Sequence, residues 1–202
     1  MDTQNNRTEL LRKIKDEIIH GKDLPLYAER VQNKVFPVIG EGSHYAKIMF
    51  IGEAPGKNEA ETGRPFCGAS GRILDELLNS INIPRNDVYI TNIVKDRPPM
   101  NRDPLPHEIE SYSSYLDRQI EIIQPQVIAT LGRFSMVYII NKFGLGSQLE
   151  SISQMHGKIL EAQINYGAVK IIPLYHPAVA VYNGNMKEDL KKDFETLRQF
   201  NH

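Results

Sequence analysis

The sequence predicts an α/β fold, a three-layer αβα sandwich around a central, mainly parallel four-stranded sheet. Four short apolar runs along the chain are typical of strands buried on both faces. Segments of helical length and helical periodicity separate these runs, as parallel strands require. In such sandwiches ligands bind beyond the carboxyl ends of the strands, so we expect the functional residues on the loops that follow the apolar runs.

Strands and helices are expected to alternate along the chain. The four strands are predicted at 47–52, 88–94, 126–132 and 169–177. Helices are predicted at 7–20, 70–82, 106–124, directly after 132, and at 186–200. The helix at 70–82 is a clear case, because Leu74, Leu77, Leu78 and Ile81 recur at helical spacing.

The 202 residues are expected to form a single domain. Within it, 1–40 would be an amino-terminal helix and loop, and 45–198 the core that carries the motifs. The net charge of −1 gives no indication of nucleic acid. No run is long enough to cross a membrane, and the polar start MDTQNNRTEL lacks the apolar core of a secretory signal. We therefore expect a cytoplasmic monomer without a membrane partner.

Cysteine and histidine usage disfavours a metal site. The chain has one cysteine, Cys67, which excludes an intramolecular disulfide and any multi-cysteine metal or iron-sulfur site within one chain. The six histidines include no pair at the i, i+4 spacing of helical metal sites. No metal ligands are therefore expected.

The loop after the first strand, residues 52–71, is rich in glycine and proline. Such residues fix a tight backbone path and bring main-chain amides close to a small ligand. Its beginning, GEAPG, matches neither GxxxxGK[ST] nor GxGxxG, which disfavours enzymes with a phosphate-binding loop.

Five separated motifs resemble family 4 uracil-DNA glycosylases. They are GEAPG at 52–56, GRPFCGASG at 63–71, TNIVKDRPPMNRDP at 91–104, LG at 131–132 and HPA at 176–178. Their order and spacing also agree with the family, and the match covers 45–198. The resemblance implies a uracil-DNA glycosylase-like fold and hydrolysis of the N-glycosidic bond of deoxyuridine in single- or double-stranded DNA. The expected products are uracil and an abasic site, as in base-excision repair.

The resemblance also implies three roles in base recognition. A glycosylase flips the nucleotide out of the helix and reads its pairing edge. Phe66 matches the aromatic that stacks on the flipped base, and Asn92 matches the amide that recognises uracil. His176 matches the histidine that donates a hydrogen bond to uracil O2 as negative charge builds. The structural alternatives are a core phenylalanine, a turn-capping asparagine and a packed histidine.

The motif at the first strand end supplies further expected substrate contacts. Gly52, Ala54 and Pro55 would shape the pocket. Ala54 stands where the family 1 enzymes, with GQDPY, carry the aspartate regarded as the water-activating base, so no direct general base is evident. Glu53 is the candidate for stabilising the cationic sugar or orienting water, and Glu59 for a second carboxylate at the pocket. Either glutamate could instead be a solvated surface group.

Two segments are expected to contact DNA. One is the proline-rich loop with its basic residues Lys95, Arg97 and Arg102. The other is the segment after HPA, where Val179, Val181 or Tyr182 would fill the position that the flipped base leaves. The sequence does not distinguish among these three. The alternatives are solvent-facing arginines and ordinary helix packing.

The family pattern breaks at the iron-sulfur cluster. Typical members hold a [4Fe-4S] cluster with four cysteines, whose positions fall here near Gly21, Leu24, Asp96 and Tyr112. We expect no cofactor, with Leu24, Leu26 and Tyr112 filling the space. The loss leaves open a shifted preference for another deaminated base, or a noncatalytic DNA or nucleobase binding module. A covalent uracil-DNA trapping relative would carry a KRRIH-like insertion, and none is visible.

Overall fold

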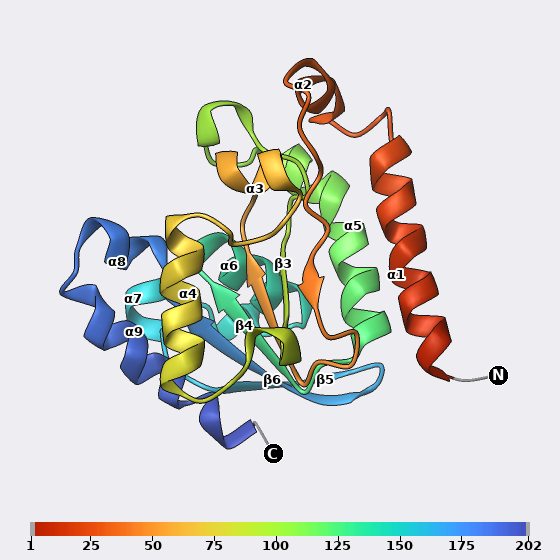
Figure 1. Cartoon of the computed structure of the whole chain (residues 1–202). Helices are drawn as coiled ribbons and strands as arrows, with labels where there is room; N and C mark the ends of the chain where they lie inside the picture. Colours follow the sequence, from red (N-terminus) through yellow and green to blue (C-terminus); the bar gives the residue numbers. More distant parts are fainter. Residues whose placement is uncertain (1–2, 201–202) are drawn as a thin grey trace.

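The structure is a computed structural model that describes residues 3–200, with one six-stranded sheet at its centre (Figure 1). The strand order is β1-β3-β2-β4-β6-β5. The strands are β1 (Glu41–Gly42), β2 (Ile48–Gly52), β3 (Tyr89–Asn92), β4 (Val127–Leu131), β5 (Leu160–Ile164) and β6 (Gly167–Leu174). The four inner strands run parallel, and the two edge strands pair antiparallel to their neighbours.

The predicted number of four strands is wrong, although all four predicted strands are present. The two additional strands lie at the edges, where one face or both remain accessible. Strand β1 has only two residues, and β5 mixes polar and apolar residues with a single fully buried one, Ala162. Continuous apolar runs identify strands buried on both faces, so that signal could not reveal either edge strand.

Nine helices and four 3-10 turns connect the strands within residues 3–200. The helices are α1 (Thr3–His20), α2 (Tyr27–Gln32), α3 (Lys57–Thr62), α4 (Ala69–Ser80), α5 (Pro106–Ile123), α6 (Arg133–Lys142), α7 (Ile152–Met155), α8 (Ala178–Tyr182) and α9 (Met186–Glu195). The turns are η1 (Arg85–Asp87), η2 (Pro99–Asn101), η3 (Gly146–Gln148) and η4 (Arg198–Phe200). Among the helices of this range, none is both long enough and apolar enough to span a membrane.

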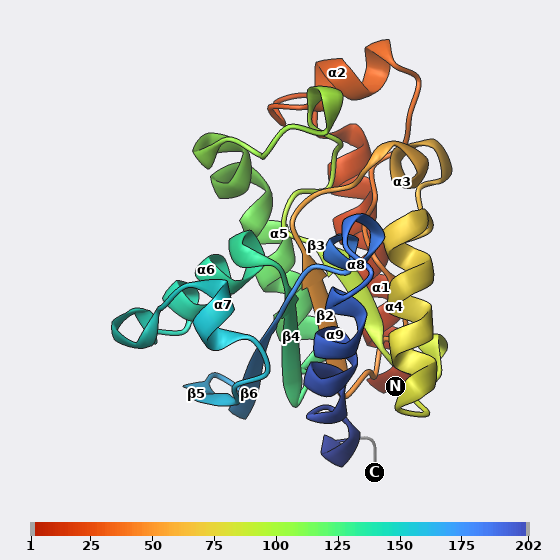
Figure 2. The ribbon, with the colours of Figure 1, turned by 90° about the vertical axis from the view of Figure 1, so that its left-hand side faces the viewer.

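The helices cover both faces of the sheet, which confirms the three-layer sandwich. Figures 1 and 2 show α4 and α9 on one side of the strands and α5 and α6 on the other. Along β2 successive side chains enter different cores: Phe50 packs with α4 and α9, and Met49 packs with α1, α5 and α6. This alternation follows from the two-residue period of a strand.

The register of the sheet brings the carboxyl ends of four strands together. Gly52 at the end of β2 is paired with Asn92 at the end of β3, and Leu131 of β4 with Leu174 of β6. The loops that follow these strands therefore all begin at the side of the sheet where the carboxyl ends of the parallel strands lie. Figure 1 shows α3 and the loop with η2 beyond this edge. The predicted position of the functional loops is confirmed.

Candidate active site

A cavity of about 330 Å³ lies at the carboxyl ends of the parallel strands. Its volume is near the lower end of the roughly 300–1,000 Å³ typical of ligand pockets, which suits a small ligand. Seven of the eight residues expected at the substrate line it: Glu53, Ala54, Pro55, Glu59, Phe66, Asn92 and His176. The eighth, Gly52, lies directly behind two of them.

Gly52 allows the asparagine and the phenylalanine of the cavity to approach each other. A Cβ atom at this position would lie 2.3 Å from Oδ1 of Asn92 and 2.9 Å from Cζ of Phe66. Both distances are shorter than van der Waals contact, so a larger residue would displace both side chains. The glycine of the first motif is therefore required by the packing of the site.

The Asn92 side chain is buried but unpaired. The residue is 2% exposed, and its carboxamide forms no hydrogen bond with any residue of the described range. Its polar atoms still reach the cavity surface, since among the described residues only Thr130 Oγ1 is both fully enclosed and without a partner. Because Asn92 lines the cavity, its amide group is available for a ligand that supplies both a donor and an acceptor.

Phe66 forms an aromatic wall of the cavity and is held in a strained backbone conformation. Its φ is 47°, in the left-handed region that non-glycine residues rarely adopt. The chain turns so tightly here that a Cβ atom at Gly71 would lie 1.9 Å from the Phe66 carbonyl oxygen. The ring lies 5.5 Å from the imidazole of His176, and the rings are tilted by 31°. The strain fixes the ring at the site.

Glu59 holds the loop that carries Phe66. Its Oε1 accepts hydrogen bonds from the amides of Cys67 at 3.0 Å and Gly68 at 2.9 Å. A carboxylate that binds two main-chain amides is not a solvated surface group, so that alternative does not apply to Glu59. The residue connects α3 to the loop that leads into α4.

His176 presents a hydrogen-bond donor in its neutral form. Its Nδ1 accepts from the main-chain amide of Ala178 at 3.1 Å, so the ring proton is carried by Nε2. Burial lowers the pKa of His176 to about 4, although Glu59 opposes this shift. At neutral pH the imidazole is therefore uncharged. Gly132, at φ 95°, allows the close approach, because its Cβ would lie 3.2 Å from that of His176.

Glu53 is the second group of the cavity whose pKa is strongly shifted. Burial raises its pKa to about 7, repulsion by Asp103 adds to the shift, and Arg133 opposes it. Its carboxyl group makes no hydrogen bond with the part of the chain that the structure describes. Glu53 therefore changes between neutral and charged forms close to physiological pH, which is typical of functional carboxyl groups.

Residues 39–198 match the family described as the uracil DNA glycosylase superfamily. The type-4 uracil-DNA glycosylase of Sulfurisphaera tokodaii is 45% identical over 94% of this chain and 84% of its own length. The enzyme of Archaeoglobus fulgidus is 46% identical over 79% of each chain, and that of Thermotoga maritima 36% over 96% of each. The chain belongs to the type-4 uracil-DNA glycosylases.

Several residues of this type-4 glycosylase site were not predicted. Ser70 and Asn101 line the cavity, and Asp103 and Arg133 influence the Glu53 carboxyl. Three of these four lie inside the matched motifs 63–71 and 91–104, and Arg133 directly follows the LG motif. The motifs themselves are therefore the signal for Ser70, Asn101 and Asp103, whereas Arg133 has none beyond its place after LG.

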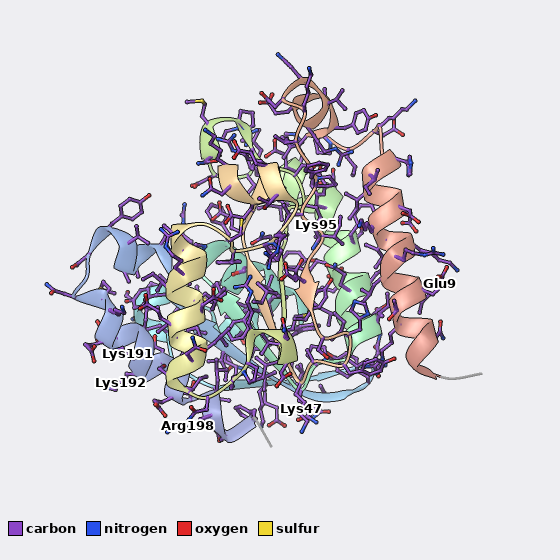
Figure 3. All side chains as sticks on the ribbon, viewed as in Figure 1. Glu9, Lys47, Lys95, Lys191, Lys192 and Arg198 are labelled. Carbon is purple, nitrogen blue, oxygen red and sulfur yellow. The ribbon has the colours of Figure 1, made fainter. Side chains whose placement is uncertain are left out.

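The predicted DNA contact of Lys95 is wrong. Lys95 is 0% exposed, and its Nζ donates to the Asn92 carbonyl, Thr91 and Gln119. Figure 3 shows Lys95 in the interior, whereas Lys192 lies at the surface of α9. The buried segment that begins with β3 continues through Asp96, although the sequence turns charged at 95. A lysine enclosed in this way cannot reach a phosphate.

The other predicted DNA contacts remain predictions, and their positions differ. Arg97 is partly exposed and donates to Asn101, and Arg102 lines the cavity while paired with Glu108 at 2.6 Å. After His176, Val179 packs against the hydrophobic core. Val181 is 45% exposed and Tyr182 is 89% exposed. Tyr182 is therefore the best placed of the three to enter DNA.

The four positions expected for cluster cysteines meet in one buried region beside α2. A Cβ atom at Gly21 would lie 2.8 Å from the side chain of Leu24. Leu24 in turn packs with Leu26 and Tyr112, so these three side chains lie together at the expected cluster positions. The hydroxyl of Tyr112 donates to Asp96 at 2.6 Å.

This region is closed by a buried ion pair. The guanidinium of Arg30 donates to both carboxylate oxygens of Asp96, at 2.9 and 3.0 Å, and to the carbonyls of Ile18 and Ile19 at 3.0 Å. None of these groups is a thiolate, so they do not fit an iron-sulfur cluster. Among the described residues, no group of three or more His, Cys, Asp or Glu side chains is placed to hold a metal ion.

Proposed function

We propose that the protein hydrolyses the N-glycosidic bond of deoxyuridine in DNA, releasing uracil and leaving an abasic site. The observation that carries this proposal is the unpaired, buried carboxamide of Asn92, which faces a cavity walled by Phe66 and a neutral His176. The assignment of the chain to the type-4 uracil-DNA glycosylases supports the same reaction.

Base choice rests on Asn92. Uracil presents a donor at N3 and an acceptor at O4, and one carboxamide can accept from the first and donate to the second. Cytosine presents the reverse pattern at these positions, so both polar atoms of Asn92 would stay unpaired as long as the carboxamide keeps its orientation. Sites of this kind reject the wrong ligand strongly. Phe66 would stack on the base after the nucleotide leaves the helix.

Bond cleavage rests on His176 and Glu53. As the glycosidic bond breaks, negative charge develops on the uracil and positive charge on the sugar. The Nε2 hydrogen of His176 would bind uracil O2 and stabilise the developing anion. The Glu53 carboxylate would stabilise the cationic sugar or orient the attacking water. Glu59 positions the loop around the base.

We also propose that the enzyme works without an iron-sulfur cluster and as a monomer. The single cysteine and the Arg30, Asp96 and Tyr112 network at the expected cluster positions support the first point. One chain builds the whole cavity, which supports the second. Iron analysis of the purified protein and activity after chelator treatment test the first, and sedimentation tests the second.

The deciding experiment measures abasic-site formation under single-turnover conditions. Substrates are matched oligonucleotides with uracil, hypoxanthine, cytosine or thymine at one position, each single- and double-stranded. We expect cleavage at uracil and loss of base choice in Asn92→Asp. Tight binding without cleavage would instead support a noncatalytic module, and cleavage restricted to hypoxanthine would support a shifted specificity.

A further inference from the structure

We propose that Lys95 is a positioning residue for base recognition: it holds the main chain of Asn92 from the interior and thereby fixes the carboxamide that reads uracil. The inference rests on the proposed function and deepens it, because it assigns the support on which the selectivity of Asn92 depends. The buried lysine has no other role in the site.

The contacts of Lys95 are short and come from three directions. Its Nζ lies 2.6 Å from the Asn92 carbonyl oxygen, 2.7 Å from Oγ1 of Thr91 and 2.6 Å from Oε1 of Gln119. Thr91 belongs to β3, and Gln119 belongs to α5 in the neighbouring layer. The lysine therefore fastens the end of β3 to a rigid helix.

The three acceptors have no hydrogen to offer Lys95. The Thr91 hydroxyl donates to the carbonyl of Ile39 at 2.7 Å. The amide nitrogen of Gln119 donates to the same carbonyl at 2.9 Å and to the hydroxyl of Tyr89 at 3.2 Å, which turns Oε1 toward the lysine. Only an ammonium group has three hydrogens for three such oxygens. Burial lowers the pKa of Lys95 well below its usual range.

Lys95 acts at the end of strand β3, where Asn92 is the last residue of the strand. Strand β3 ends at Asn92, and the chain then bends over β2, with the amides of Ile93 and Val94 bound to the carbonyls of Gly52 and Glu53. Lys95 reaches back three residues and binds the carbonyl of Asn92 at the start of this bend. A shift of the main chain here would move the carboxamide relative to Phe66, and small displacements of a reading group are costly for recognition.

A lysine that served only the fold would affect stability alone, so the test measures its coupling to Asn92. Single-turnover kcat/KM on uracil DNA is compared for the wild type, Lys95→Met, Asn92→Ala and the double variant, each corrected for the folded fraction by circular dichroism. We expect Lys95→Met to lower kcat/KM about 10- to 100-fold in the wild type, because a hydrogen bond to a charged group is lost. In the Asn92→Ala background we expect a change below about threefold, because the group that Lys95 positions is gone.

Tyr112→Phe is the matched control. It removes a hydrogen bond from another buried side chain that does not touch Asn92, so its corrected kcat/KM should equal that of the wild type. If Lys95→Met does not fold, Gln119→Met replaces it in the same cycle, with a smaller loss expected in the same direction.

The outcomes separate the two proposals. Equal losses from the lysine variant with and without the Asn92 carboxamide would overturn the role of Lys95 while leaving the glycosylase intact. Absence of uracil excision by the wild type would overturn the proposed function itself.

Discussion

Asn92 and Asp96 lie four residues apart on one buried segment, but only the Asp96 side chain forms hydrogen bonds within the described chain. The Asn92 carboxamide, in a residue 2% exposed, has no partner in the described chain and borders the cavity. The Asp96 carboxylate, in a residue 1% exposed, is bound by Arg30 and Tyr112. A polar group that borders a cavity can be completed by a ligand, whereas an enclosed charge needs a partner from the protein. The paired carboxylate contributes to the fold, and the unpaired carboxamide is free for the base that we propose as its ligand.

The largest expected effect is a loss of stability, and it comes from the paired region around Asp96 and Arg30. Asp96→Ala leaves the Arg30 guanidinium buried without its carboxylate, so we expect a loss of about 3–5 kcal/mol in the free energy of unfolding. Urea denaturation measures it. Glu9→Ala is the control, because the Glu9–Arg12 pair is exposed and exposed pairs contribute about 0–1 kcal/mol. Similar losses in the two variants would contradict the structural role of the Asp96 network.

In the cavity that Asn92 borders, which we call the unpaired region, a substitution is expected to lower the rate of bond cleavage instead. His176→Ala removes the donor to uracil O2, and loss of one such donor lowers the chemical rate about 10²- to 10³-fold. Single-turnover kinetics should show this loss with little change in DNA affinity. His20→Ala is the control, since His20 is exposed at the end of α1. A loss confined to DNA binding would exclude the proposed role of His176.

The comparison also shows what the sequence could predict. Phe66, Asn92 and His176 belong to three separate motifs, and the strand pattern correctly placed all three beyond the carboxyl ends of the strands. This worked because the carboxyl ends of parallel strands share an edge, whatever the sequence between them. The prediction for Lys95 was wrong because its neighbours in the sequence do not show which element covers it. A lysine next to Asp96 and a proline-rich loop is typical of an exposed segment. Only the position of α5, which contributes Gln119, shows that Lys95 is enclosed.

The paired region could be predicted only in part. The packing of Leu24, Leu26 and Tyr112 against one another follows from their apolar or aromatic side chains. Arg30 gave no signal, because nothing in the sequence indicates that it meets Asp96, 66 residues away. The raised pKa of Glu53 is of the same kind, since it depends on burial and on Asp103, which lies on another loop.

The Glu53 carboxyl predicts a pH dependence of the unpaired region. Its pKa is about 7, so below this pH it is protonated and loses the charge that would stabilise the sugar cation. We expect the single-turnover rate to fall about tenfold per pH unit below 7 and to be level above it. His176, with a pKa near 4, contributes no break in this range.

Two variants sharpen the pH prediction. Glu53→Gln should abolish the break, and Asp103→Asn should move it to lower pH because the repulsion that raises the Glu53 pKa is removed. A break near pH 7 that persists in Glu53→Gln would assign the titration to another group.

The smallest effect is expected at the rim of the cavity, where a side chain is neither paired nor buried. Tyr182 is 89% exposed, so Tyr182→Ala should leave the free energy of unfolding unchanged. If the ring enters the space left by the flipped base, its stacking contributes about 1 kcal/mol, and the Kd for uracil-containing duplex should rise about fivefold. Fluorescence anisotropy measures the Kd, with Ile159→Ala, 44% exposed beside β5, as the control.

Single-stranded DNA separates a wedge from an ordinary contact. Because single-stranded DNA leaves no vacated stack to fill, the Tyr182→Ala variant should bind it as the wild type does. Equal weakening on both substrates would mean that Tyr182 contacts the DNA without acting as the wedge.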